Sequence, residues 1–260
     1  MSVEYTLNGD VALITLNRPD RYNAVDHAMA GGLIDALERA GVESRAAVLT
    51  GAGKAFCSGA DLAILKDDYE SGSPDLAALL DDVFHPTIRA LIDCKVPIVA
   101  AVNGVAAGAG LGIVLACDIR VFADSAFLTS AFTAIGLAPD SGTTWWLPHH
   151  VGVSKALELT LTNRRVDADE AVSLGLAWGV VGDNEVVASA TELAASLADL
   201  VPDSLVTTRR LVRDSGALSF EAALAAEKEE QGRLGRTPEH HEGVMAFLEK
   251  RPADFRQNAR

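Results

Sequence analysis

The sequence is poor in aromatic residues and in basic residues. Aromatic side chains make up 5% of the 260 residues, and 22 Lys and Arg stand against 36 Asp and Glu, a formal net charge of −14. Binding to phosphate backbones needs a clustered basic surface. We therefore expect no nucleic-acid partner.

Cysteine is equally scarce, and its spacing offers neither a disulfide framework nor a metal site. The cysteines lie in or beside apolar stretches and form no C-x-x-C pair: Cys57, Cys94 and Cys117. This usage is typical of buried thiols in a reducing cytoplasm. The pairs His149–His150 and His240–His241 are adjacent and cannot share one helical face, so no metal site is expected.

An uninterrupted apolar run is also missing. Met1–Leu16 alternates in polarity, so no signal peptide is expected. Val96–Cys117 carries no charge, but Pro97, Asn103 and four glycines interrupt it. We therefore expect a cytoplasmic protein without a membrane span.

Strand and helix patterns alternate first, and a tail that is helical throughout follows. Val3–Leu7 and Val11–Leu16 predict a β-hairpin around Asn8-Gly9-Asp10. Apolar spacing predicts one long helix over Asp75–Ile92. The tail is predicted to form helices over about Glu185–Leu200, Asp203–Asp214, Phe220–Leu234 and Pro238–Glu249. The fold class is therefore α/β with a C-terminal helical region.

Two glycine-rich turns carry the expected chemistry. One lies in Val99–Asp118, where an apolar run meets Gly108–Gly110 and a helix begins; the other lies in Gly51–Leu65, where a helix is predicted to open near Ala60. The first N–H groups of a helix lack partners inside it, so each turn can direct one at a ligand. Two such donors suit the negative oxygen of an enolate or a tetrahedral intermediate. A packing turn that merely needs small residues is the alternative.

Other familiar motifs are incomplete. Gly51–Lys54 lacks the spacing and the Ser or Thr of a P-loop, and Gly108–Gly110 lacks the later glycine and the acidic residue of a dinucleotide fingerprint. Pro139–Gly142 lacks the first glycine of the G-x-S-x-G elbow. These stretches therefore indicate neither a nucleotide cofactor nor a serine hydrolase.

Three segments, in this order, resemble the enoyl-CoA hydratase/isomerase (crotonase) superfamily: LTGAGKAFCSGADL, AAVNGVAAGAGLGIVLACDIRVFA and GLAPDSGTTWWLPHHVG. The likeness runs from LNRPDRYNA to EGVMAFLEKR. It implies a spiral of ββα units over residues 1–200, with the active site, and a helical trimerisation region over residues 201–260. It also implies a homotrimer or a dimer of trimers, and an acyl-CoA thioester as substrate with no separate cofactor.

The resemblance also implies roles for individual residues. The N–H groups of Ser58 and Ala109 would hold the thioester oxygen, while the loop Arg18–Ala24 and the turn Ala60–Leu62 would embrace the CoA nucleotide and pantetheine. The remaining implied substrate contacts are Asp61, Gly110, Phe132, Leu137 and Lys250, the last from a neighbouring subunit.

The residues alone leave plainer alternatives open. By its position alone, Asp61 is expected to stabilise a helix N-terminus or to tie a loop, rather than to act as a catalyst. Arg18 and Lys250 are equally consistent with solvated surface charges.

Two departures from the family pattern bear on the reaction. Hydratases of this family carry two glutamates, and the matching positions here are Gly112 and Phe132. Neither residue can transfer a proton, so hydration by two glutamates is not expected.

Asp140, in GLAPDSG, is the expected acid/base group. This segment resembles ring-1,2-epoxyphenylacetyl-CoA isomerases, in which a small residue and glycine follow the Pro-Asp pair. Desolvation by Phe132, Ile135, Leu137 and Trp145 would raise the pKa of this carboxyl. One such carboxyl can take a proton from one carbon and return it to another. A turn residue after Pro139 is the alternative.

These observations predict an acyl-CoA isomerase that works through a thioester enolate, of the Δ3-Δ2-enoyl-CoA or the epoxyphenylacetyl-CoA type. The alternatives are a weak or broad enoyl-CoA hydratase that uses Asp140 alone, a thioesterase on the same turns, and a non-catalytic CoA-binding member of the family.

Overall fold

Two sheets frame the protein, and in the middle of the chain consecutive strands alternate between them. The computed structural model describes residues 1–256, in which the larger sheet has the order β1-β2-β3-β5-β7-β10 and the smaller the order β4-β6-β8-β9. The strands are β1 (Val3–Asn8), β2 (Val11–Leu16), β3 (Ala46–Gly51), β4 (Ala55–Cys57), β5 (Ile98–Val102), β6 (Val105–Ala107), β7 (Ile119–Ala123), β8 (Phe127–Thr129), β9 (Val166–Asp167) and β10 (Gly179–Val181). From β3 to β8, each turn of the chain therefore adds one strand to each sheet.

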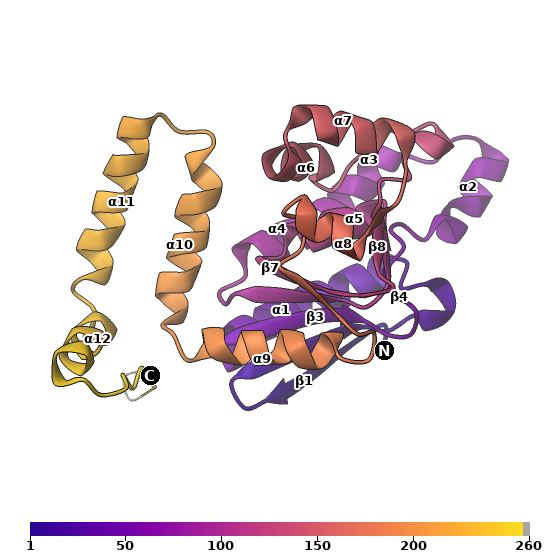
Figure 1. The fold of residues 1–260 in the computed structure, drawn as a ribbon. Coiled ribbons are helices and arrows are strands. Elements are labelled where there is room, and N and C mark those ends of the chain that lie inside the picture. The colour runs from indigo at the N-terminus through magenta and orange to yellow at the C-terminus, as the bar shows by residue number, and fades with distance from the viewer. Residues whose placement is uncertain (257–260) are drawn as a thin grey trace.

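Helices fill the connections between the strands and form the tail (Figure 1). The α-helices are α1 (His27–Glu43), α2 (Lys66–Ser71), α3 (Leu76–Leu79), α4 (His85–Asp93), α5 (Ala109–Ala116), α6 (Thr143–Val151), α7 (Val153–Thr162), α8 (Ala168–Ser173), α9 (Val186–Ala198), α10 (Pro202–Ser215), α11 (Phe220–Leu234) and α12 (Pro238–Glu249). Short 3-10 turns are η1 (Pro19–Arg21), η2 (Leu62–Leu65) and η4 (Thr133–Ile135), and η3 (Leu80–Phe84) is π-helical. The predicted α/β class with a helical C-terminal region is confirmed.

The larger sheet follows the sequence pattern closely. β1 and β2 pair antiparallel around Asn8, which confirms the predicted hairpin. β2, β3, β5, β7 and β10 are parallel neighbours, and every residue of β3 and β5 is buried. Helix α9 packs on β3, β5 and β7, and α1 packs on β1 and β2. Parallel strands covered in this way read as continuous apolar runs.

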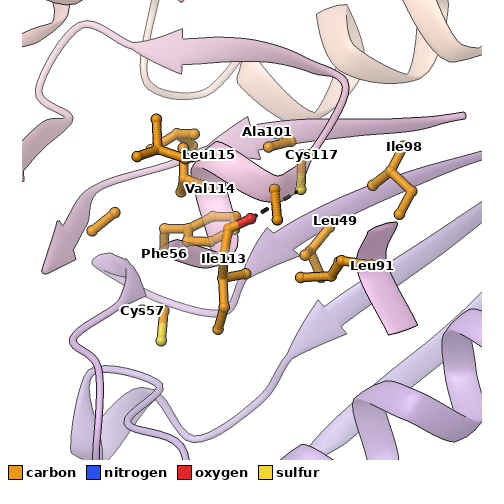
Figure 2. Packing of buried hydrophobic residues seen from close by; sticks show 14 of the residues in the cluster. Leu49, Phe56, Cys57, Leu91, Ile98, Ala101, Ile113, Val114, Leu115 and Cys117 are labelled. Atoms are coloured by element: carbon orange, nitrogen blue, oxygen red, sulfur yellow. Dashed lines mark hydrogen bonds between the residues drawn. The ribbon is translucent and has the colours of Figure 1, made fainter. Parts of the chain in front are cut away.

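Helix α5 is the centre of the core. All eight of its residues are buried, and Ile113, Val114 and Leu115 lie among side chains from β3, β4, β5 and α4 (Figure 2). The Cys117 thiol closes the end of this helix by donating to the Ile113 carbonyl. A helix that is apolar on every face must be enclosed on every face. Its N-terminus is therefore held rigidly in place.

Two predicted helices differ from the structure. The helix expected over Asp75–Ile92 is divided by η3, where the His85 N–H bonds back to the Leu80 carbonyl. Pro86 explains the widened turn, because it has no N–H to donate and its ring displaces the carbonyl four residues earlier. The helical segment expected to open near Ala60 begins two residues later, at Leu62, as a 3-10 turn, because Ala60 itself forms an isolated bridge with Val25.

Helices α10, α11 and α12 stand to one side of the sheets (Figure 1). Asp118, at the start of β7, anchors α10 by ion pairs to Arg209 at 3.1 Å and Arg213 at 3.0 Å. No helix among residues 1–256 combines the length and the apolar character needed to cross a bilayer. The cysteine prediction is confirmed, since Cys57, Cys94 and Cys117 are all buried and free.

Candidate active site

The two predicted turns lie side by side because the strands before them are paired. β4 and β6 are parallel, with Ala55 opposite Val105 and Cys57 opposite Ala106. The carboxyl ends of parallel neighbours meet at the same edge of a sheet. The turn after β4 and the turn that opens α5 therefore face each other.

Gly59 makes this close approach possible. Its φ of 93° lies in the left-handed region, and a Cβ there would come within 2.9 Å of the Ala107 carbonyl oxygen and 3.2 Å of the Ala109 nitrogen. Glycine is the residue that accepts both the dihedral angle and the contact. The backbone of the first turn is therefore pressed directly against the N–H that opens α5.

The donor predicted in the first turn is wrong, because the Ser58 N–H is already bonded. It donates to the Tyr22 carbonyl at 3.0 Å, and the Asp61 N–H donates to Val25 at 3.0 Å. Within the described chain, the N–H of Ala60 has no acceptor, and neither has that of Ala109 at the first position of α5. Ala60 therefore replaces Ser58 as the open donor of the first turn, and Ala109 is an open donor of the second.

The loop that runs from Arg18 to Ala24 is fixed by internal bonds. The Arg18 guanidinium pairs with Asp61 at 2.7 Å and with Asp26 at 3.1 Å, and it also donates to the Ala24 carbonyl. Asn23 is fully buried and donates to the carbonyls of Ala52 and Ala55. Arg18 is therefore not a solvated surface charge, and its contact with the CoA nucleotide stays a prediction.

Asp61 joins this loop to the first turn. Besides its pair with Arg18, it accepts from the Ala63 N–H at 3.2 Å as the N-cap of η2. That is the loop tie and helix-end role that the residue alone predicted. The side chain of Leu62 is exposed beside it, where a ligand can reach it.

Gly110 serves packing, and its predicted contact with the substrate stays a prediction. It is buried, and a Cβ there would overlap the Cys57 carbonyl oxygen and lie 3.0 Å from the Cys57 Cβ. The absence of a side chain lets α5 rest on β4. Gly110 thus positions the neighbouring Ala109.

Asp140 lies in the loop that packs on the opening turns of α5. Its carboxylate accepts from the Ser141 hydroxyl at 2.7 Å, and its carbonyl accepts from the Thr143 N–H that begins α6. Burial raises the pKa of the Asp140 carboxyl, and the Ser141 hydroxyl and the charge of His85 oppose part of that rise. A half-buried carboxyl with a raised pKa accepts and returns a proton more readily than an ordinary aspartate.

The two positions that hold glutamate in hydratases are filled differently here. Gly112 is buried, and a Cβ there would lie 2.7 Å from the Cβ of Ser141 and overlap its carbonyl oxygen. Phe132 is buried too, and its ring comes within 3.9 Å of where a Cβ of Gly108 would stand. Both places are thus occupied by apolar groups or backbone beside the opening of α5.

The apolar surroundings predicted for Asp140 are met only in part. Leu137 is half-buried and donates its N–H to the Phe132 carbonyl. Ile135 and Trp145 are 57% and 44% exposed, and their part in covering this carboxyl stays a prediction. Trp145 stacks on His149 and lines a groove of about 720 Å³ between α4, α6 and α10.

His85 is a polar neighbour that sequence reasoning missed. Its Nδ1 lies 3.1 Å from Asp81 Oδ1, and it is close enough to Asp140 for its charge to lower the pKa of that carboxyl. The i,i+4 spacing of Asp81 and His85 could have indicated the pair from the sequence. Its position near the Asp140 loop depends on the π-helical turn and on the fold, which the sequence does not show.

Lys250 lies far along the tail, at the end of α12 (Figure 1). It is exposed and adopts a φ of 55°. Its contact with a neighbouring subunit's CoA stays a prediction. Across residues 1–256, no group of three or more His, Cys, Asp or Glu is arranged to hold a metal ion.

Comparison with known proteins places this geometry in context. The family model described as enoyl-CoA hydratase/isomerase matches residues 6–258. A probable enoyl-CoA hydratase of Rhodobacter capsulatus is 41% identical and covers 98% of this chain and 97% of its own. The 1,2-epoxyphenylacetyl-CoA isomerase of Escherichia coli is 36% identical, with 94% of each chain covered. A crystal structure of a putative enoyl-CoA hydratase/isomerase from Mycobacterium abscessus superimposes with a TM-score of 0.89 at 36% identity, over 97% of this chain and 98% of that one.

Proposed function

The chain belongs to the enoyl-CoA hydratase/isomerase family, and on this premise we propose that it is an acyl-CoA isomerase that works through a thioester enolate. The observation that carries the proposal is the set of groups around the opening of α5. The two positions where hydratases place glutamates hold Gly112 and Phe132, and the carboxyl beside them is Asp140. An isomerisation needs one group that moves a proton, whereas hydration usually needs two.

In this mechanism the N–H groups of Ala60 and Ala109 hold the thioester oxygen. The Asp140 carboxylate takes a proton from Cα of a Δ3-enoyl thioester, and the electron pair moves onto the oxygen to give a dienolate. The protonated Asp140 then returns the proton to Cγ, which leaves the Δ2 isomer and the carboxylate as before. Each fixed backbone donor stabilises the negative oxygen and contributes a factor on the order of 10²–10³ to the rate.

The same groups suit a substrate with a strained ring. In an epoxyphenylacetyl-CoA, Asp140 would assist the opening of the ring next to the enolate. The similarity to an epoxyphenylacetyl-CoA isomerase supports this substrate class. The loop Arg18–Ala24 and the turn Ala60–Leu62 would bind the nucleotide and pantetheine.

We include a homotrimer or a dimer of trimers in this proposal. The tail stands apart from the sheets and exposes large apolar side chains, among them Val212, Phe220, Phe247 and Leu248. Contiguous exposed apolar side chains mark association surfaces. Lys250 would then reach the CoA of a neighbouring subunit. Sedimentation equilibrium of the full chain distinguishes these assemblies from a monomer.

The test compares three reactions in one preparation: Δ3-to-Δ2 isomerisation, epoxide isomerisation and crotonyl-CoA hydration. Asp140→Asn should lower the isomerase kcat by about 10²–10⁴-fold, the usual contribution of a general acid/base. Burial raises the pKa of Asp140, and the reaction needs its ionised form. As the pH is lowered, wild-type activity should therefore be lost at a higher pH than an ordinary aspartate would give.

Asp169→Asn is the matched control, because it neutralises an exposed aspartate on α8 and should leave all three rates unchanged. Brisk hydration that survives Asp140→Asn would overturn the proposal.

Enoyl-CoA hydration with water positioned by Asp140 alone is the second candidate. The relative named a probable enoyl-CoA hydratase favours it. Hydration faster than either isomerisation, and lost in Asp140→Asn, would establish it. Release of free CoA would identify a thioesterase, and tight acyl-CoA binding without turnover would identify a non-catalytic binding protein.

A further inference from the structure

Ser141 holds an unusual conformation directly beside Asp140. It is 2% exposed, its φ of 52° is left-handed, and its hydroxyl donates to Asp140 Oδ1 at 2.7 Å. Glycine would adopt this backbone without strain, whereas serine does so at a cost. The bond that the Ser141 hydroxyl makes to Asp140 is therefore the feature that glycine at this position would lack.

Gly112 provides the space that Ser141 occupies. A Cβ on Gly112 would overlap the Ser141 carbonyl oxygen and lie 2.7 Å from the Ser141 Cβ. Helix α5 cannot retreat, because every one of its residues is buried and it packs on β4, β6, α4 and α6. A side chain at position 112 and Ser141 in its present place thus exclude each other.

We propose that Ser141 is the positioning residue for Asp140, and that Gly112 is the specificity-determining residue that lets Ser141 reach its place. This inference rests on the isomerase function proposed above. The Ser141 hydroxyl holds Oδ1 and so fixes the carboxyl plane, which leaves Oδ2 as the oxygen that takes the proton and gives it back. The backbone of Ser141 fills the space where a glutamate would otherwise hold a water.

The electrostatic consequence has a definite sign. A donor to the ionised carboxylate favours that form, so the Ser141 hydroxyl lowers the pKa of Asp140 against the rise caused by burial. The other charged group that acts on Asp140 is His85 of α4, paired with Asp81. Removing the hydroxyl leaves the His85 side chain in place and should therefore raise the pKa of Asp140.

The experiment uses Ser141→Ala and Ser141→Gly in the full chain, with Thr143→Val as the matched control. Thr143 is two residues away, and its buried hydroxyl has no partner among residues 1–256. Both Ser141 variants should lower the isomerase kcat by about ten- to a hundredfold, because a bond to a charged group is lost. KM should stay within about twofold, since a positioning role acts on the reaction rather than on binding. The acidic limb of the kcat profile should move to higher pH, whereas Thr143→Val should leave that limb in place.

A second readout does not depend on turnover. The Asp140 carboxyl carbon, assigned by its loss in Asp140→Asn, is titrated by ¹³C NMR in aspartate-labelled protein. Its midpoint should rise in Ser141→Ala and Ser141→Gly. An unchanged midpoint in both, with unchanged kcat, would overturn the positioning role. Full isomerase activity in Asp140→Asn would instead overturn the proposed function, whatever the Ser141 variants show.

Gly112→Ala tests the same contact from the α5 side. The added methyl must displace Ser141, so the Asp140 titration should shift upward as it does in Ser141→Ala. A folded Gly112→Ala protein with the wild-type midpoint would overturn the role of Gly112. Ser141→Gly keeps the positioning role testable if Gly112→Ala does not fold, because glycine relaxes the strained backbone.

Discussion

At the scale of single residues, Gly110 and Gly112 are near neighbours on α5 that lack side chains for different reasons. Gly110 lies against the Cys57 carbonyl and lets the helix rest on β4. Gly112 lies against Ser141 and lets the Asp140 loop close. The sequence shows two glycines in an apolar helix, but only the structure shows which neighbour each one admits.

Gly112→Glu tests whether the missing glutamate can simply be restored. We expect no gain in crotonyl-CoA hydration, because the new side chain must displace Ser141 and so disturb Asp140. We also expect a loss of unfolding free energy on the order of 4 kcal/mol, from the overlap and from an unpaired buried carboxylate. Urea unfolding and a hydration assay measure the two effects.

Gly31→Glu is the control for that substitution. Gly31 is exposed on α1, and the described chain leaves the space around it open within 4 Å. Its stability should change by less than about 1 kcal/mol. Efficient hydration by a stable Gly112→Glu protein would contradict the argument.

At the scale of elements, the pairing of β4 with β6 decides where the two glycine-rich turns lie. Each strand has three residues, and their parallel register places the Ala60 and Ala109 turns at one edge. Gly59 then sets how closely the turns approach. The proposed oxyanion site therefore depends on two short strands and on Gly59, and not on a reactive side chain.

Gly59→Ala should separate the two turns. Its Cβ would come within 2.9 Å of the Ala107 oxygen, so either the Ala60 or the Ala109 donor must move. We expect kcat to fall about 10²-fold, the cost of one misplaced oxyanion donor. Steady-state isomerisation kinetics measure this fall.

Gly175→Ala separates backbone strain from the loss of the contact. Gly175 has a φ of 73° but no neighbour within 4 Å in the part of the chain that the structure describes. It should lose about 1 kcal/mol of stability and no activity. Equal kcat losses in the two variants would contradict the role of Gly59.

The sequence predicted the elements that have a long, regular period and missed those that depend on contacts. The hairpin of β1 and β2 and the helices of the tail follow from periodicity. The strands β4 and β6 are too short for an alternating pattern to be recognised. The choice between Ser58 and Ala60 as donor was beyond reach, because Tyr22 takes the Ser58 N–H from a loop far along the chain.

At the scale of the whole molecule, one largely buried carboxylate, that of Asp118, anchors the tail. Asp118 binds Arg209 and Arg213 of α10, one helical turn apart, and also accepts from the Ile98 N–H of β5 at 2.8 Å. Arg209 bonds the Cys94 carbonyl as well, and Arg213 lies over the Trp146 ring at 4.9 Å. This cluster sets the direction in which the proposed trimerisation surface leaves the sheets.

Asp118→Asn should therefore weaken the tail and the fold together. The three side chains are at most 15% exposed, so neutralising Asp118 leaves two largely buried guanidinium groups without their counter-charge. Breaking one partner of a buried ion pair costs several kcal/mol, and we expect a loss of about 3 kcal/mol in urea unfolding. Asp214→Asn is the control, since its pair with Arg210 spans 3.9 Å at the surface and contributes less than about 1 kcal/mol.

If α10 directs assembly, sedimentation should show Asp118→Asn dissociating at concentrations where Asp214→Asn remains assembled. An Asp118→Asn protein as stable and as assembled as Asp214→Asn would mean that apolar packing, and not this ion cluster, holds the tail.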